Sequence, residues 1–192
     1  MTNKEKKEAI ASHFSSIMKI LDLDLNDNSL KDTPNRVAKM YVDELFEGLN
    51  KNKIPHIKKF DNSFEYKGMI LEKNISLYSL CEHHFVPIVG KAHVGYFANN
   101  KIVGLSKLNR IVNYFSKRPQ VQEKLTIQIV EFLKKELKTE DVACIIDAQH
   151  LCVSMRGVKD VNNWTTTAEY SGKFLESSYK NEFLNLIISK NS

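Results

Sequence analysis

The sequence predicts an α+β protein in which an antiparallel sheet is covered by helices on one face. The chain of 192 residues is long enough for one domain with a sizeable core. Its 42% hydrophobic and 27% charged residues are ordinary for a globular protein and argue against disorder. Apolar periodicity gives pairs of strands separated by helices, in the order ααββααββα. Such hairpins favour an antiparallel sheet over the parallel sheet of βαβ units.

Two helices are expected at the amino-terminal end. Apolar side chains recur at helical spacing from Ile10 to Leu21. Thr33-Pro34 is typical of an N-cap followed by a first-turn proline, so a second helix is expected to begin there. The polar stretch 50–62 is the best candidate for a hinge. We therefore expect an amino-terminal helical segment over 1–50 and a main domain over 51–192, which work as one functional unit.

The remaining elements follow the alternation of strand pairs and helices. A connection between two strands is also where sites tend to lie. The expected elements are strands at about 69–78 and 88–97, a short helix capped by Ser106, a longer helix opened by Pro119, strands at about 142–158 and 165–174, and a last helix at about 177–188.

Composition narrows the location and the partners. The longest apolar runs fall far short of the roughly 20 residues that a membrane span needs, and the Lys-rich amino terminus lacks the apolar region of a signal peptide. We expect a cytoplasmic protein without a membrane partner. Its three cysteines, an odd number, favour thiol chemistry or metal binding over a disulfide framework. The net charge of +5 is dispersed among acidic residues, which fits a small anionic substrate and gives no nucleic-acid signature.

A cluster of polar residues, Cys-Glu-His-His at 81–84, lies in the expected connection between the first two strands. Thiolate and imidazole are ligands that zinc prefers, and Cys81-x-x-His84 places one of each close together. A second thiol and imidazole, Cys152 and His150, lie two residues apart on the expected strand 142–158, where even spacing puts side chains on one face. Three protein ligands plus water are typical of catalytic zinc sites. We therefore expect Cys81, His84 and Cys152 to hold Zn²⁺.

The two other histidines of these clusters have open roles. His83 and His150 are candidates for acid and base catalysis beside the metal, because an unperturbed imidazole has a pKa near ~6.5. If His150 were a fourth ligand, the site would be structural. For 81–84 alone, a polar loop around one buried thiol is the alternative. Cys144 has apolar neighbours and is expected in the core.

Three groups of basic residues could hold an anion. Lys107 and Arg110 lie three apart near the start of the helix that Ser106 caps, where free N–H groups favour anions. Arg36 and Lys39 have the same spacing in the Thr33-Pro34 helix. On the expected strand, Arg156 shares a face with Cys152 and Ser154. A solvated helix surface is an equally good interpretation of each pair taken alone.

Gln122 and Glu123 lie in the first turns of the helix that Pro119 opens. Glu123 has no basic residue three or four positions away, so the usual helix-local ion pair is missing. A carboxylate there could accept hydrogen bonds from a donor pair such as the N1–H and exocyclic amine of guanine. An exposed carboxylate stabilised by the helix dipole is the alternative.

Together these residues resemble the GTP cyclohydrolase I family. Long motifs occur in the right order over nearly the whole chain from Thr33 onward, which is far more specific than a lone Cys-x-x-His. The matching segments are Thr-Pro-Asn-Arg-Val-Ala-Lys-Met-Tyr-Val at 33–42, Cys-Glu-His-His-Phe at 81–85, Gly-Leu-Ser-Lys-Leu-Asn-Arg at 104–110, Arg-Pro-Gln-Val-Gln-Glu-Lys-Leu at 118–125, His-x-Cys-x-x-x-Arg-Gly at 150–157 and Thr-Thr-Thr at 165–167.

The resemblance implies a reaction and a role for each position. GTP and water would give formate and 7,8-dihydroneopterin triphosphate, the first step of pterin and folate biosynthesis. The imidazole ring of guanine opens, C8 leaves as formate, and the ribose rearranges and closes a new ring. The implied roles are zinc ligands for Cys81, His84 and Cys152, proton carriers for His83 and His150, guanine readers for Gln122 and Glu123, and triphosphate contacts for Ser106, Lys107, Arg110 and Arg156, with Arg36 and Lys39 as further phosphate contacts.

The resemblance also implies an architecture. The family has the tunnelling fold, whose short antiparallel sheets join across subunits, and its members resemble toroidal homodecamers with active sites between subunits and with allosteric control. We therefore expect an inactive monomer and a catalytic domain over 51–192. The segment before Thr33 carries none of the family's motifs, so we expect no regulation through an amino-terminal extension.

Two other functions would fit parts of the sequence. A nitrile reductase of the tunnelling fold would use a cysteine nucleophile and a nicotinamide cofactor, without the three-ligand zinc set. A zinc-stabilised nucleic-acid-binding module would use the positive charge, bind in a salt-sensitive way and turn nothing over.

Overall fold

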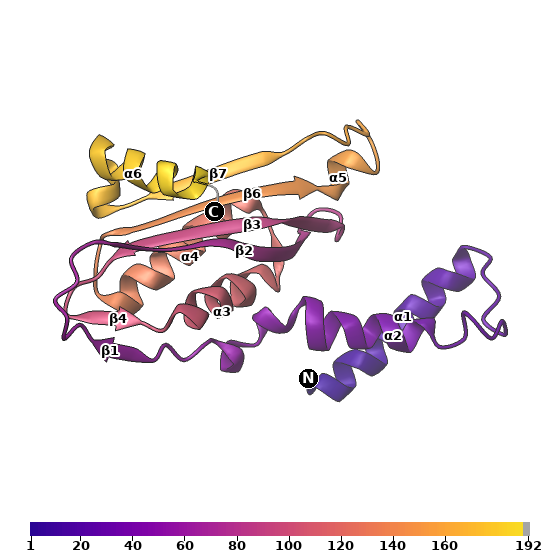
Figure 1. Cartoon of the computed structure of the whole chain (residues 1–192). Coiled ribbons are helices and arrows are strands. Elements are labelled where there is room, and N and C mark those ends of the chain that lie inside the picture. The colour runs from indigo at the N-terminus through magenta and orange to yellow at the C-terminus, as the bar shows by residue number, and fades with distance from the viewer. Residues whose placement is uncertain (190–192) are drawn as a thin grey trace.

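The computed structural model of the chain describes residues 1–189. Its amino-terminal helices extend to one side of a sheet that is layered with helices (Figure 1). The helices are α1 (Asn3–Ile20), α2 (Thr33–Met40), α3 (Leu105–Ser116), α4 (Gln122–Leu137), α5 (Leu151–Ser154) and α6 (Ser177–Ile188). The strands are β1 (Lys59–Asp61), β2 (Met69–Cys81), β3 (Pro87–Phe97), β4 (Lys101–Val103), β5 (Pro119–Gln120), β6 (Val142–His150) and β7 (Thr165–Tyr170).

The main sheet has the strand order β5-β2-β3-β6-β7. The pairs β2–β3, β3–β6 and β6–β7 are antiparallel, and only the two-residue strand β5 runs parallel to its neighbour β2. A second, two-stranded sheet of β1 and β4 was not expected from the sequence. The α+β class and the antiparallel sheet are confirmed.

The main sheet is covered on both faces. Helices α3 and α4 cover one face, where Ile111, Leu133 and Ile146 share the larger core cluster. Helix α6 packs on the opposite face, where Phe183 meets Phe174 in a second core cluster. The expectation of helices on one face therefore holds for α3 and α4 and is wrong for α6. The reason lies in the alternation of the strands, which carry apolar side chains on both faces at this end of the sheet.

The strand expected over 142–158 is shorter than predicted. Strand β6 ends at His150, because its partner β3 begins at Pro87 and the last pair of the ladder joins His150 to Ile88. Beyond that pair the backbone has no neighbour to hydrogen-bond, and the chain turns into the short helix α5. The prediction that His150, Cys152 and Arg156 share one strand face is therefore wrong.

Several other boundaries differ from the predicted ones. Pro119 does not open a helix but forms β5 with Gln120, and α4 begins at Gln122. Helix α3 begins at Leu105 with Gly104 as its N-cap, so Ser106 lies inside the first turn. Strand β7 ends at Tyr170 instead of near residue 174, and a 3₁₀ turn follows.

The amino-terminal helices pack mainly on each other. Helix α1 lies against α2, which continues through a π-helical turn to Leu45. A hydrogen bond from the backbone N–H of Gly48 to the carbonyl of Lys117 ties this segment to the end of α3, at 2.9 Å. None of the helices in the described part of the chain has the length and apolar character needed to cross a bilayer.

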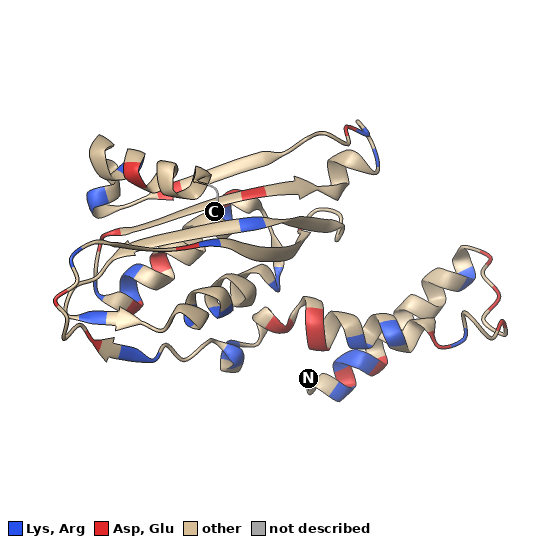
Figure 2. Cartoon of the chain, viewed as in Figure 1, with Lys and Arg blue, Asp and Glu red and all other residues tan. Residues whose placement is uncertain are grey.

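One end of the main sheet gathers the residues that carry chemistry. The carboxyl ends of β2 and β6 and the start of β3 meet there, because neighbouring strands run antiparallel. The starts of α4 and β7 lie at the same end. Lys and Arg are interspersed with Asp and Glu over most elements, as the sequence predicts (Figure 2).

Candidate functional site

Two thiols and an imidazole converge at this end of the sheet. Cys81 is the last residue of β2, His84 lies in the following turn, and Cys152 lies in α5. Their ligand atoms lie within 4.8 Å of one another, and the group could hold a metal ion. The turn is closed by hydrogen bonds from the N–H of Phe85 to the carbonyl of Cys81 (2.8 Å) and from the N–H of Cys81 to the carbonyl of Val86 (2.9 Å). It doubles the chain back so that residues three apart face the same point.

The ring of His84 is oriented from both sides. Its Nδ1 lies 3.9 Å from the Sγ of Cys81, and its Nε2 lies 2.9 Å from an Nη of Arg156. The donor set of this group, two thiols and one imidazole, suits a metal ion that prefers sulfur and nitrogen ligands.

The charges of the two thiolates also favour a bound cation. Burial raises the pKa of the Cys152 thiol, and a hydrogen bond and the charge of Cys81 raise it further. Two neighbouring thiolates repel each other and share this partly buried space only when a cation neutralises them. A divalent cation is such a partner.

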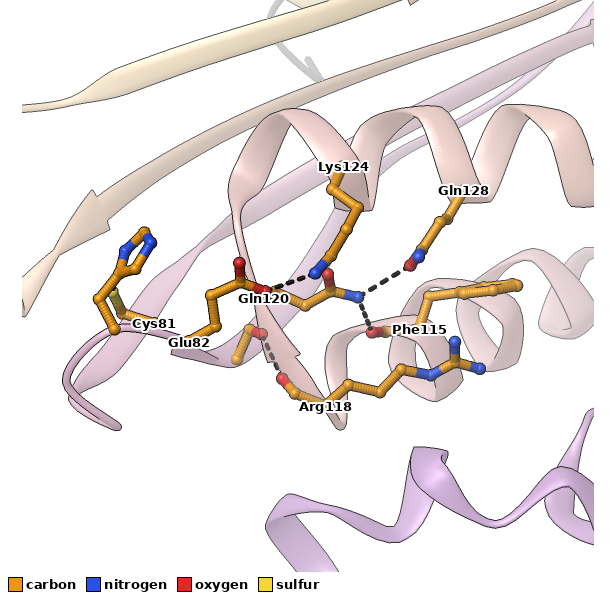
Figure 3. Close-up of polar contacts among 9 residues, drawn as sticks. Cys81, Glu82, Phe115, Arg118, Gln120, Lys124 and Gln128 are labelled. Carbon is orange, nitrogen blue, oxygen red and sulfur yellow. Dashed lines mark hydrogen bonds and ion pairs between the residues drawn. The ribbon is translucent and has the colours of Figure 1, made fainter.

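Contacts to α4 and β5 brace the turn that carries His84 (Figure 3). The N–H of Glu82 donates to the carbonyl of Gln120 at 3.0 Å, and the carboxylate of Glu82 pairs with Lys124. The hydrogen bond from Lys124 lowers the pKa of Glu82, so this carboxylate stays charged and paired. The amide of Gln120 is itself held by the carbonyl of Phe115 at 2.7 Å and by Gln128 at 3.0 Å.

His150 lies half-buried at the end of β6, two residues from Cys152. Its Nε2 is 2.6 Å from Oε1 of Gln122, the first residue of α4. Burial lowers the pKa of His150, because the charged imidazolium loses hydration, while the carboxylate of Glu123 opposes this shift. Burial therefore favours the neutral form of this imidazole.

His83 lies in the same turn and, like His84, is exposed. Its Nδ1 is 3.8 Å from the Sγ of Cys81. The structure thus brings seven of the predicted positions to one end of the sheet: Cys81, His83, His84, Gln122, Glu123, His150 and Cys152.

Arg156 joins this group through His84, but the other predicted anion contacts do not. Asn109 of α3 donates to the carboxylate of Glu72 on β2 at 3.2 Å, whereas Ser116 at the other end of α3 accepts from Ser79 at 2.7 Å. Helix α3 therefore begins at the end of β2 remote from Cys81. Glu72 precedes Cys81 by nine residues on one strand, which is roughly 30 Å at about 3.3 Å per residue.

The α3 residues that were predicted to bind phosphate thus lie apart from the thiol and imidazole group, at a cleft of their own. Lys107 and Arg110 line a cleft of about 300 Å³ together with His56 and Lys53. Ser106 lies in the same first turn of α3. Lys107 and Arg110 precede Ser116 by nine and six residues, which is about 9–14 Å along α3. Ser79, which donates to Ser116, precedes Cys81 by two residues, so Lys107 and Arg110 lie roughly 15–20 Å from Cys81.

Arg36 and Lys39 lie on α2, in the amino-terminal segment. Arg36 is exposed and lies 3.8 Å from the carboxylate of Asp32. Within residues 1–189 of one chain, neither Arg36 nor Lys39 contacts the group formed by Cys81, His84 and Cys152.

Some residues that shape the site carry no signal in the sequence. Thr126 and Thr167 hydrogen-bond to each other and to Gln122. Lys124 pairs with Glu82 across 42 positions of sequence. The Thr-Thr-Thr motif marks the segment of Thr167, but only the register of β7 against β6 shows which of its hydroxyl groups faces α4.

Comparisons with known proteins agree on one family. The family described as GTP cyclohydrolase I matches residues 10–188, which extends the match beyond the motifs that begin at Thr33. The protein named GTP cyclohydrolase 1 of Flavobacterium johnsoniae is 54% identical over 187 residues, covering 97% of this chain and 84% of that protein. The protein of the same name from Tolumonas auensis is 50% identical over 185 residues, covering 96% and 86% of the two chains.

A comparison with solved structures finds a weaker likeness. The apo crystal structure of an archaeosine synthase QueF-Like matches with a TM-score of 0.47 and 13% identity, covering 56% of this chain and 97% of that chain. A likeness of this size adds nothing to the family match, which spans the whole sheet and the residues at its Cys81 end.

Proposed function

Since the chain belongs to the GTP cyclohydrolase I family, we propose that it converts GTP and water into formate and 7,8-dihydroneopterin triphosphate, the first step of pterin and folate biosynthesis. The convergence of Cys81, His84 and Cys152 within 4.8 Å carries the proposal. These residues come from two segments some 70 positions apart, and the proton carrier His150 lies two residues from Cys152.

The ion that we assign to this group is zinc. Its donor set of two thiols and one imidazole is the set that zinc favours, and three protein ligands are typical of catalytic sites. Bound zinc supplies Lewis acidity and makes water nucleophilic near neutral pH. An Nη of Arg156 lies 2.9 Å from Nε2 of His84, on the side away from Cys81.

The histidines move the protons of ring opening. A proton that His150 delivers to N7 of guanine makes C8 electron-poor, so that water adds there. The lowered pKa of His150 makes its proton easier to release than that of an exposed imidazole. His83, in the same turn, moves the second proton as the C8–N9 bond opens and leaves C8 as a formamide on N7; a second water then cleaves the C8–N7 bond and formate leaves.

The substrate is held by its two ends. The carboxylate of Glu123 accepts from the N1–H and exocyclic amine of guanine, which fits its place beside His150, and the resemblance implies Gln122 as a second guanine position. Ser106, Lys107 and Arg110, with Arg156 and with Arg36 and Lys39, would bind the triphosphate, since several cations are needed for its charge.

We propose that more than one chain contributes to this site. The α3 residues assigned to phosphate lie along α3 away from Cys81, at roughly 15–20 Å, and a neighbouring subunit would supply them to the site. Strand β7 ends the main sheet with an open edge, which a second copy can extend. We therefore propose the tunnelling fold with sheets joined across subunits, a homodecamer and sites between subunits. A cytoplasmic location and allosteric control also remain predictions.

The experiment is an incubation of zinc-loaded protein with GTP, in which formate and oxidised, fluorescent dihydroneopterin triphosphate are both measured. Wild type releases both, and His150→Ala releases neither. His13→Ala is the matched control, because His13 is exposed on α1 and makes no contact with the site. A wild type that holds zinc, assembles and releases neither product would refute the proposal.

A further inference from the structure

The side-chain amide of Gln122 has one possible orientation. Gln122 is 1% exposed, and its Nε2 lies 3.0 Å from the carbonyl oxygen of Ile146, 2.8 Å from that of Thr165 and 3.2 Å from the hydroxyl of Thr167. Turning the amide over would place its oxygen against two carbonyl oxygens, which offer no hydrogen. The nitrogen therefore faces these three acceptors and Oε1 faces the other way.

That orientation determines the proton position on His150. Oε1 of Gln122 lies 2.6 Å from Nε2 of His150 and has no hydrogen to give. Nε2 must therefore be the donor. A neutral imidazole carries one ring hydrogen, so Nδ1 of neutral His150 keeps a free lone pair.

Two hydroxyl groups complete a directed chain of hydrogen bonds. The hydroxyl of Thr126 donates to the backbone carbonyl of Gln122 at 2.8 Å. Since a hydroxyl has one hydrogen, the 2.7 Å contact between Thr126 and Thr167 is a donation from Thr167. The oxygen of Thr167 is then free to accept from Gln122. In this series of hydrogen bonds, from Thr126 to His150, the donor and the acceptor of every bond are therefore assigned without conflict.

We infer that Gln122 is a positioning residue, which holds neutral His150 as the Nε2–H tautomer and leaves Nδ1 as the nitrogen that exchanges a proton with the substrate. The inference rests on the proposed function, in which His150 carries that proton. It differs from the role expected of Gln122 from the sequence, because its amide nitrogen is bonded within the chain. A guanine reader and a positioning residue have different effects on turnover.

The first test reads the tautomer directly. The ring ¹⁵N signals of zinc-loaded, ¹⁵N-histidine-labelled protein are recorded at alkaline pH, where the ring is neutral, and the His150 signals are assigned by their loss in His150→Ala. Wild type shows the Nε2–H pattern. Gln122→Met adds a share of the Nδ1–H form. Gln128→Met, the same substitution six residues along α4, is the control, because Gln128 bonds Gln120 and not His150.

The second test separates positioning from guanine reading. Gln122→Met lowers kcat for formate release by about 100-fold, while KM for GTP stays within about threefold, because only the proton transfer is misaligned. Thr167→Val, which removes one acceptor of the amide, loses about tenfold in kcat. This variant keeps the Gln122 side chain and serves where Gln122→Met fails to fold.

The outcomes distinguish a failure of the positioning role from a failure of the proposed function. An Nδ1–H tautomer in wild type, an unchanged tautomer in Gln122→Met, or a raised KM with kcat preserved overturns the positioning role. Wild type that shows the Nε2–H tautomer but releases no formate contradicts the proposed function instead, so the two failures are distinguishable.

Discussion

Two inactive variants should restore each other if the site is shared between subunits. His150→Ala removes the proton carrier at the Cys81 end of the sheet. The double variant Lys107→Ala/Arg110→Ala removes two cations at the start of α3. Within one chain Lys107 and Arg110 lie roughly 15–20 Å from the Cys81 end of the sheet, so each variant leaves the other half of the site intact.

The size of the recovery follows from the geometry. Loss of a charge-assisted contact costs about 1.5–3 kcal/mol, so the double variant loses about 10²- to 10⁴-fold in kcat/KM. In random assemblies of equal amounts, a shared site has one chance in two of an intact proton-carrier half and one in two of an intact phosphate half. About a quarter of the sites are then complete, and about a quarter of wild-type activity returns.

The assay uses co-expressed variants with different tags. Mixed assemblies are purified over both tags and tested for formate release from GTP. A mixture of His150→Ala with Cys152→Ser is the control, because both substitutions lie in the same half and no site is completed. Activity in the first mixture no higher than the sum of the separate variants would show that each chain carries a whole site and would refute the shared arrangement.

Three further predictions concern the metal and the core. Cys152→Ser loses zinc, measured by elemental analysis, whereas Cys144→Ala keeps it because Cys144 is buried in the core away from the ligand group; equal zinc in both would contradict the ligand assignment. Zinc affinity, followed with an indicator dye, falls as pH falls, because burial raises the pKa of Cys152 and protons compete with zinc for its thiolate. The affinity changes about tenfold per pH unit for each proton released. An affinity independent of pH would contradict this prediction. Phe183→Ala lowers the free energy of unfolding in urea by about 3–5 kcal/mol, because the ring is fully buried under α6. Phe64→Ala, at an 88% exposed ring, changes it by less than about 0.5 kcal/mol, and equal effects would contradict the packing of α6.

The sequence predicts the local features of this fold well. The spacing of apolar residues places β2, β3, α4 and α6 within a few residues, because amphipathic periodicity is a local property. It fails where an element depends on a partner far along the chain. Strand β6 stops at His150 because only Pro87, which has no N–H to donate, remains in β3 beyond the last pair, and that limit is set by the register between the two strands.

The sequence likewise predicts some features of the candidate site and misses others. The convergence of Cys81, His84 and Cys152 is expected from ligand chemistry and from the family's motifs, and the structure brings them together although Cys152 lies on a helix instead of a strand. The hydrogen bond between Gln122 and His150 is not visible in the sequence, since it depends on how α4 is rotated over β6. The distance between α3 and the thiols likewise appears only when the direction of α3 along β2 is known.

The most direct test of the proposed reaction is the balance of products from GTP. Zinc-loaded wild type, with its metal content and assembly measured in the same sample, is expected to release formate and 7,8-dihydroneopterin triphosphate in equal amounts as GTP disappears. Protein that holds zinc at its full content and assembles, yet leaves GTP intact, would contradict the assignment of Cys81, His84, Cys152 and His150 to this chemistry.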